Sequence, residues 1–114
     1  MSIITVCERR EAKGLDAHVP LILRGDALYD PDLDRFFLDL PLAGIRSRHS
    51  LRAYAYDVVV WLRFLDACSK MIWRAARDDI DAYHRARRRD EVGHRITAAS
   101  WNRAVASLDR LYRW

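Results

Sequence analysis

Two segments of the chain place hydroxyl residues beside arginine or histidine in a pattern that could bind an anion. In residues 47–52 and again in residues 97–103, a Ser or Thr able to cap a helix is followed three residues later by a second Ser, with Arg or His within a turn. A helix N-terminus offers unpaired N–H groups and a partial positive charge, to which the arginines add full charges. Both segments therefore predict phosphate-binding helix starts, and two such starts on one side of a fold would straddle a nucleic-acid backbone.

The side chains expected to contact phosphate belong to these helix starts and the residues just before them. Arginines neutralise phosphate charge, and hydroxyl groups add hydrogen bonds that position a protein on the backbone. The same residues also fit a solvated arginine face whose hydroxyls serve only as caps, and composition alone does not decide between the two. The candidate DNA-binding residues are Arg46, Ser47, Arg48, His49, Ser50, Arg52, Arg95, Thr97, Ser100 and Arg103.

The charge distribution favours an anionic partner for the later part of the chain. The 114 residues carry a formal net charge of +4 and are 51% hydrophobic, which suits one domain with a buried core. Residues 1–46 hold 6 basic and 8 acidic side chains, whereas residues 47–114 hold 14 basic and 8 acidic ones. The excess of positive charge thus belongs to the segment that contains both candidate helix starts.

Several other kinds of site are disfavoured by the sequence. Cys7 and Cys68 form no C-x-x-C pair, and the four histidines lie at least ten residues apart, so we expect no metal site and no cofactor. Asp78, Asp79 and Asp81 suit the first turn of a helix better than an acid–base pair, and no glycine-rich phosphate loop occurs. No apolar run approaches a membrane span, and we expect a cytoplasmic location in a reducing compartment, without membrane contact.

Helical periodicity dominates the chain after residue 30. Asp30 followed by Pro31 is typical of an N-cap and the first helical position, and apolar residues then recur at three and four positions. The first 30 residues show no sustained period beyond one extended piece at 19–23. The sequence therefore predicts an all-α fold, a small orthogonal helical bundle in residues 31–114 that follows an irregular N-terminal arm over 1–30. The bundle is expected to contain a short helix at about 31–40 and main helices at about 48–68, 78–90 and 98–113.

Aromatic and basic residues outside the two helix starts are expected to be structural. Arg87, Arg88 and Arg89 end the second main helix, where cations favour the helix dipole, and we expect them to be mostly solvated. Four aromatic residues lie on apolar stripes, so core packing is favoured over stacking on bases: Tyr54, Trp61, Tyr83 and Trp101.

A set of residues in fixed order and spacing resembles the N-terminal core-binding domain of tyrosine recombinases, the phage-integrase type. The resemblance covers about residues 45–114, and the preceding segment from Tyr29 to Gly44 is similar to the lead-in of actinobacterial integrases. The residues that carry it are Ser47, Ser50, Tyr54, Asp57, Phe64-Leu65, Asp79-Ile80, Tyr83, Thr97, Ser100, Asn102-Arg103, Leu111-Tyr112 and Trp114.

The resemblance implies a SAM-like bundle that covers one face of double-stranded DNA at a recombination site, while a separate catalytic domain grips the other face. It implies DNA contacts at Ser47, His49, Ser50 and Ala53, and again at Thr97, Ser100 and Arg103. Strand exchange belongs to that catalytic domain, which we expect this chain to lack, so this chain alone is expected to be no enzyme.

The end of the chain suggests a second function. The last helix reaches Trp114 without a stop signal, which suggests an element that continues. The chain is therefore expected to lack a C-terminal catalytic domain. The resemblance also implies a homo-oligomer on DNA, because recombinases assemble as tetramers. The alternative is a helical protein-interaction or oligomerisation module that docks through this helix.

Overall fold

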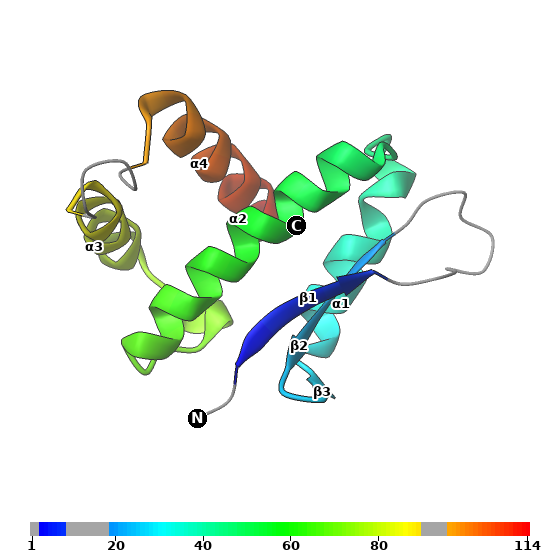
Figure 1. Ribbon diagram of the computed structural model, residues 1–114, viewed down its shortest axis with the longest axis horizontal. Helices are drawn as coiled ribbons and strands as arrows, with labels where there is room; N and C mark the ends of the chain where they lie inside the picture. The colour runs from blue at the N-terminus through cyan, green and yellow to red at the C-terminus, as the bar shows by residue number, and fades with distance from the viewer. Residues whose placement is uncertain (1–2, 9–18, 90–95) are drawn as a thin grey trace.

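The computed structural model describes residues 3–8, 19–89 and 96–114, and within them four α-helices accompany a small antiparallel sheet (Figure 1). Two short 3₁₀ turns, η1 and η2, connect helices. In chain order the elements are β1 (Ile4–Glu8), β2 (Pro20–Arg24), β3 (Ala27–Leu28), α1 (Pro31–Asp39), η1 (Pro41–Ala43), α2 (Arg48–Ala67), η2 (Ile72–Arg74), α3 (Arg77–Arg88) and α4 (Ala98–Arg113).

The sheet shows that the all-α prediction is wrong and that the fold is mixed α/β. β1 pairs antiparallel with β2, with Ile4 opposite Arg24 and Glu8 opposite Pro20, and β2 pairs antiparallel with β3. The arm was predicted to be irregular, but residues 4–8 and 20–24 form a ladder, and only the extended piece at 19–23 was anticipated. The error has a physical cause: strands this short show little periodicity, and they are stabilised by partners distant in sequence.

The four predicted helices are present, and local signals set their starts. The Asp30 carboxylate accepts hydrogen bonds from the N–H groups of Asp32 and Leu33, both at 3.1 Å, with Pro31 as the first helical residue of α1. Ser47 and Thr97 cap α2 and α4 in the same way, each accepting from the N–H three residues later. α3 has acidic residues in its first turn and basic residues in its last turn, as its dipole favours.

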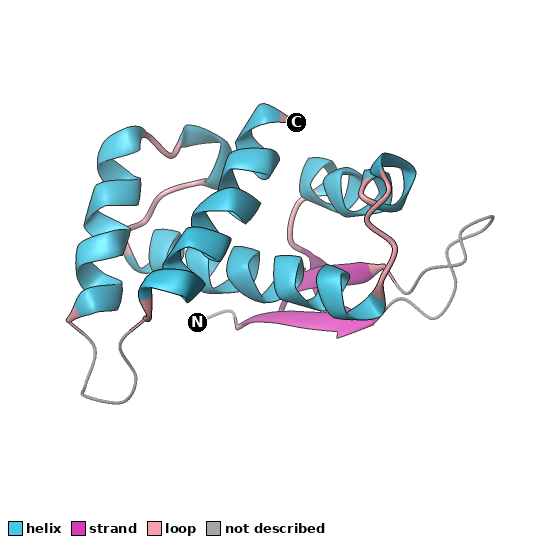
Figure 2. Ribbon diagram, turned by 90° about the horizontal axis from the view of Figure 1, so that it is seen from above, coloured by secondary structure: helices cyan, strands magenta, loops and turns pink. Residues whose placement is uncertain are grey.

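Helix α2 forms the centre of the fold. Figure 2 shows that the strands and α1 lie against one part of α2, whereas α3 and α4 lie against the other part. Trp61 on α2 is fully buried, and the core around it draws residues from both the sheet and the helices. The strands add Ile4 and Ile22 to this core, and the Arg63 side chain of α2 donates to the Ile4 carbonyl oxygen at 2.9 Å. The sheet is thus packed onto α2.

A chain of hydrogen bonds joins α2, α4 and η2 beside the core. The Trp61 indole N–H donates to the Tyr112 hydroxyl at 2.9 Å, and that hydroxyl donates to the Ile72 carbonyl oxygen at 2.8 Å. Burial raises the pKa of Tyr112 to about 12, so the hydroxyl keeps its proton in ordinary solution. These bonds fix the end of α4 against the centre of the fold.

Candidate nucleic-acid interface

The starts of α2 and α4 lie on the same side of the molecule. In Figure 1 both helix N-termini lie along the upper edge, and the view turned by 90° in Figure 2 again places them at one edge, separated along the longest axis. The capping hydroxyls of Ser47 and Thr97 are held at 3.0 and 3.1 Å from the N–H groups that they cap. The two hydroxyl-and-arginine segments thus occupy one side of the fold at some distance from each other.

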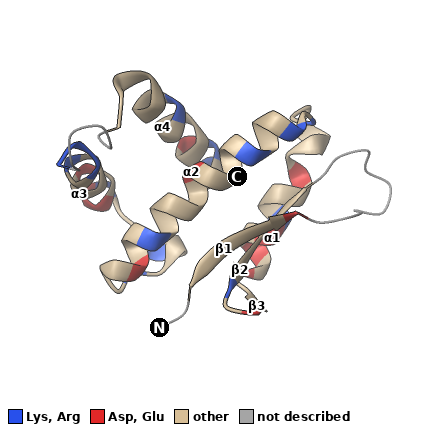
Figure 3. Cartoon of the chain, viewed as in Figure 1, with Lys and Arg blue, Asp and Glu red and all other residues tan. Residues whose placement is uncertain are grey.

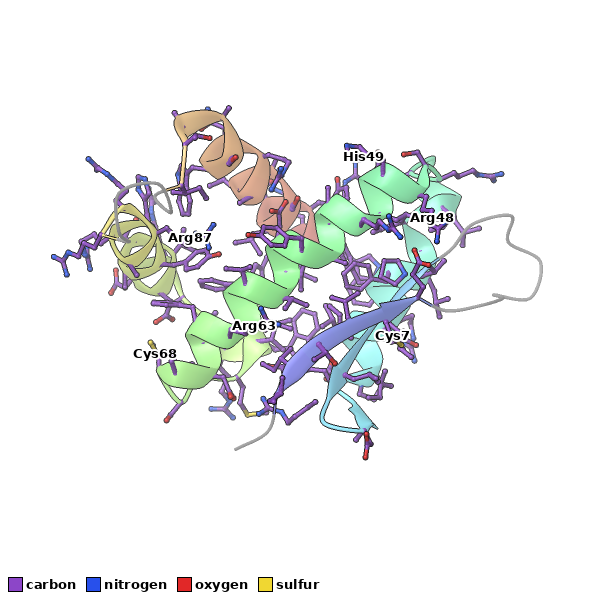
Figure 4. The ribbon with its side chains drawn as sticks, viewed as in Figure 1. Cys7, Arg48, His49, Arg63, Cys68 and Arg87 are labelled. Carbon is purple, nitrogen blue, oxygen red and sulfur yellow. The ribbon has the colours of Figure 1, made fainter. Side chains whose placement is uncertain are left out.

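At the start of α2, the arginines are held by an acidic residue from the sheet. Arg48 forms a two-pronged contact with the Glu8 carboxylate, through Nη2 at 2.6 Å and Nε at 2.9 Å. Arg52 contacts the same carboxylate at 3.1 Å. Figure 4 shows Arg48 turned toward the end of β1, and Figure 3 shows the acidic position at that strand end close to the basic first turns of α2. One carboxylate therefore partly neutralises two candidate DNA-binding arginines.

The electrostatics of this cluster are dominated by the Arg48 hydrogen bond. That bond, aided by the charges of Arg48 and Arg52, lowers the pKa of Glu8 from 4.5 to about 2. The Arg48 and Arg52 side chains nevertheless remain 52% and 63% exposed, so solvent and ions reach both guanidinium groups. The cluster is a surface ion pair that another anion can compete for.

The other candidates at this helix start differ in their surroundings. Arg46 donates through Nε to the Pro41 carbonyl oxygen at 3.2 Å, a contact that closes the turn before α2. His49 is exposed and points away from the sheet along the upper edge (Figure 4). The Ser47 and Ser50 hydroxyls lie 3.1 Å apart, beside the open end of the helix.

At the start of α4, Arg103 reaches a buried acid on α2. Its guanidinium donates to the Asp57 carboxylate at 2.8 and 3.2 Å, and the Ser107 hydroxyl donates to the same carboxylate at 2.9 Å. Asp57 is only 3% exposed, whereas the Arg103 side chain is half exposed. Its hydrogen bond to Asp57 raises the pKa of Arg103. This pair joins α4 to α2 while leaving one side of the guanidinium accessible.

The remaining candidates of the second segment lie around this pair. Thr97 is exposed and Ser100 is half-buried. Arg95 lies outside the described residues.

Neither acid that holds these arginines was predicted to do so, although Asp57 is among the residues that carry the resemblance. Asp57 carried a usable signal, because an acidic residue between Tyr54 and Val58 falls on the apolar stripe of the helix and so needs a partner. Glu8 carried none, since 40 residues separate it from Arg48.

The interpretation of the other aromatic and basic residues is correct in part. All four aromatic residues assigned to the core pack in or against it: Tyr54, Trp61, Tyr83 and Trp101. Arg88 and Arg89 are exposed as expected, but Arg87 is half-buried.

Over the described part of the chain, no group of three or more His, Cys, Asp or Glu side chains is arranged to hold a metal ion. Cys7 and Cys68 are exposed free thiols. Among the helices described, none combines the length and apolar character needed to cross a membrane.

Helices α1 to α4 form a small helical domain in which side chains cap the starts of α1, α2 and α4. A family model for the phage integrase N-terminal SAM-like domain matches residues 33–114, a stretch that runs from α1 to the end of α4 and leaves out the three strands. The chain therefore belongs to the phage integrase family through its N-terminal SAM-like domain. No curated protein and no solved structure matches the chain significantly.

Proposed function

We propose that this domain binds double-stranded DNA as the non-catalytic half of a recombinase clamp, with strand exchange carried out by a separate catalytic domain. The observation that carries the proposal is the placement of two capped helix starts, each with arginine nearby, on one side of an integrase-family domain. Each start offers a hydroxyl residue, unpaired N–H groups and a guanidinium to a phosphate.

The charges at the two starts predict modest, salt-sensitive affinity. Arg48 and Arg52 share one carboxylate, and Arg103 shares another with Ser107, so much of the positive charge is already compensated. Contacts of this kind hold the phosphate backbone and carry little sequence information. The isolated domain should therefore bind duplex DNA weakly and discriminate poorly between sequences.

A titration of duplex DNA carrying recombination-arm sequence, at two salt concentrations, tests the proposal. Arg48→Ala should weaken binding roughly tenfold, because it removes a charge-assisted contact, and should reduce the salt slope by about 0.9. Arg74→Ala is the matched control, since Arg74 is exposed beyond the opposite end of α2.

Arg103→Ala tests the second helix start but leaves Asp57 buried with only Ser107 as partner. We therefore pair it with the double variant Asp57→Asn, Arg103→Ala, which removes the buried charge as well. Wild-type binding in both the Arg48 and the Arg103 variants would refute the proposed surface.

A second candidate function is protein docking through α4. Val105 and Tyr112 of α4 and Trp114 just after it are 38%, 39% and 46% exposed, which leaves large apolar side chains accessible to a partner. Light scattering without DNA separates the two functions. Self-association that persists at high salt favours docking, whereas a monomer that shifts duplex DNA favours the first function.

A further inference from the structure

A small cavity of about 170 Å³ opens between α2, α3 and the start of α4. Its walls combine residues of the second helix start with side chains from α2 and α3. The polar groups that line it include Asp57, Arg87, Thr97, Ser100 and Arg103.

Arg87 is the unusual member of this lining. Its Nε atom is buried and has no hydrogen-bond partner among the described residues. Figure 4 shows the Arg87 side chain extending from α3 toward α2 and α4, and its guanidinium carbon lies 6.0 Å from the centre of the Tyr83 ring. A buried donor without an acceptor is unfavourable, so an acceptor from outside the domain would stabilise this arrangement.

The acceptor that the cavity itself contains is already in use. The Asp57 carboxylate accepts from the Arg103 guanidinium at 2.8 and 3.2 Å and from the Ser107 hydroxyl at 2.9 Å. Two arginines and one aspartate thus line the cavity, which leaves it with an excess of positive charge. The ligand that fits is an anion with several acceptor oxygens.

The backbone of Arg87 also contacts the segment that leads into α4. Its carbonyl oxygen accepts from the Ile96 N–H at 3.3 Å, one residue before the Thr97 cap. The end of α3 and the start of α4 are therefore joined next to the cavity. A phosphate there would meet the Arg87 side chain and the open end of α4 at the same time.

We propose that Arg87 binds a phosphate group of the DNA strand that passes the start of α4. The inference rests on the proposed function and adds to it a contact from α3, a helix to which no DNA contact was assigned. It also distinguishes Arg87 from Arg88 and Arg89, which are exposed and carry the same charge.

The test compares Arg87→Ala with Arg88→Ala in duplex titrations at two salt concentrations. Both substitutions remove one positive charge from the same helix end, so the difference between their DNA affinities measures what the position of Arg87 in the cavity contributes to binding. Arg87→Ala should weaken binding roughly tenfold and reduce the salt slope by about 0.9, while Arg88→Ala should change affinity less than about twofold. Equal effects of the two substitutions would overturn the inference.

A measurement on the wild-type protein keeps the test independent of how the variants fold. The Arg87 Nε–H resonance, assigned by its loss in Arg87→Lys, should shift when a short duplex is added and return as salt is raised. If the Arg87 resonance does not shift while resonances at the start of α4 do, the inference about Arg87 is contradicted but the proposed function is not. Absence of duplex binding by the wild-type domain, or unchanged binding in both Arg48→Ala and Arg103→Ala, contradicts the proposed function instead.

Discussion

Replacing Glu8 with glutamine should strengthen DNA binding by this domain. The Glu8 carboxylate lies at the start of α2, where a helix N-terminus favours an anion, and it contacts both Arg48 and Arg52. It therefore occupies the position that the proposed function gives to a DNA phosphate. Glutamine keeps the size of the side chain but removes the charge that competes with phosphate.

The size of the effect follows from the charges at this helix start. Two guanidinium groups and one carboxylate leave one net positive charge, and Glu8→Gln raises this to two. One additional phosphate contact would steepen the salt slope by about 0.9. Because all three side chains are accessible to solvent and screening, we expect an affinity gain of roughly three- to tenfold at low salt, shrinking as salt is added.

Fluorescence anisotropy with a labelled duplex at two salt concentrations measures this gain. Asp26→Asn is the matched control, because Asp26 is an exposed acid in the turn between β2 and β3 and its removal changes the net charge equally. Circular dichroism verifies that both variants are folded. If Glu8→Gln binds no more tightly than Asp26→Asn, then Glu8 does not compete with DNA and the reasoning is refuted.

Two further predictions concern stability. The hydrogen bond from Arg48 lowers the pKa of Glu8 from 4.5 to about 2, so the ion pairs of Glu8 stabilise the fold fully above about pH 4.5 and are lost as the pH falls toward 2. In urea unfolding, the difference in unfolding free energy between wild type and Glu8→Gln should therefore shrink as the pH falls through this window. A difference that stays constant with pH would contradict the assignment. Tyr112→Phe removes the hydroxyl that joins the Trp61 indole N–H to the Ile72 carbonyl, and should lower the free energy of unfolding by about 1–3 kcal/mol. Tyr56→Phe is the control, because Tyr56 is 53% exposed, and it should change the free energy of unfolding little in the same urea experiment. Equal losses of stability in the two variants would argue against a stabilising role for the Tyr112 hydroxyl.

Much of the helical framework could be predicted because its signals act over a few residues. Asp30-Pro31, Ser47 and Thr97 mark helix starts through hydrogen bonds that span two or three positions. The apolar stripe of α2 predicted its buried face for the same reason, since residues three or four apart share one side of a helix. The order and spacing of these local features also carried the resemblance to the integrase family.

The sheet and the partners of the arginines could not be predicted in this way. β1 pairs with a strand that begins 12 residues after it ends, and Glu8 meets Arg48 across 40 positions. Arg87 illustrates the same limit, because nothing in the run Arg87-Arg88-Arg89 distinguishes the residue that turns toward α2 and α4 from the two that face solvent.

The sequence by itself therefore determined the four helices, their capped starts and the family, since each depends on neighbouring residues or on their order. The tertiary structure alone decided that the N-terminal segment forms a sheet against α2. It also decided that Glu8 and Asp57 hold the candidate arginines and that Arg87 faces a cavity. These features depend on contacts between residues far apart in the chain, which only the packing of the elements brings together.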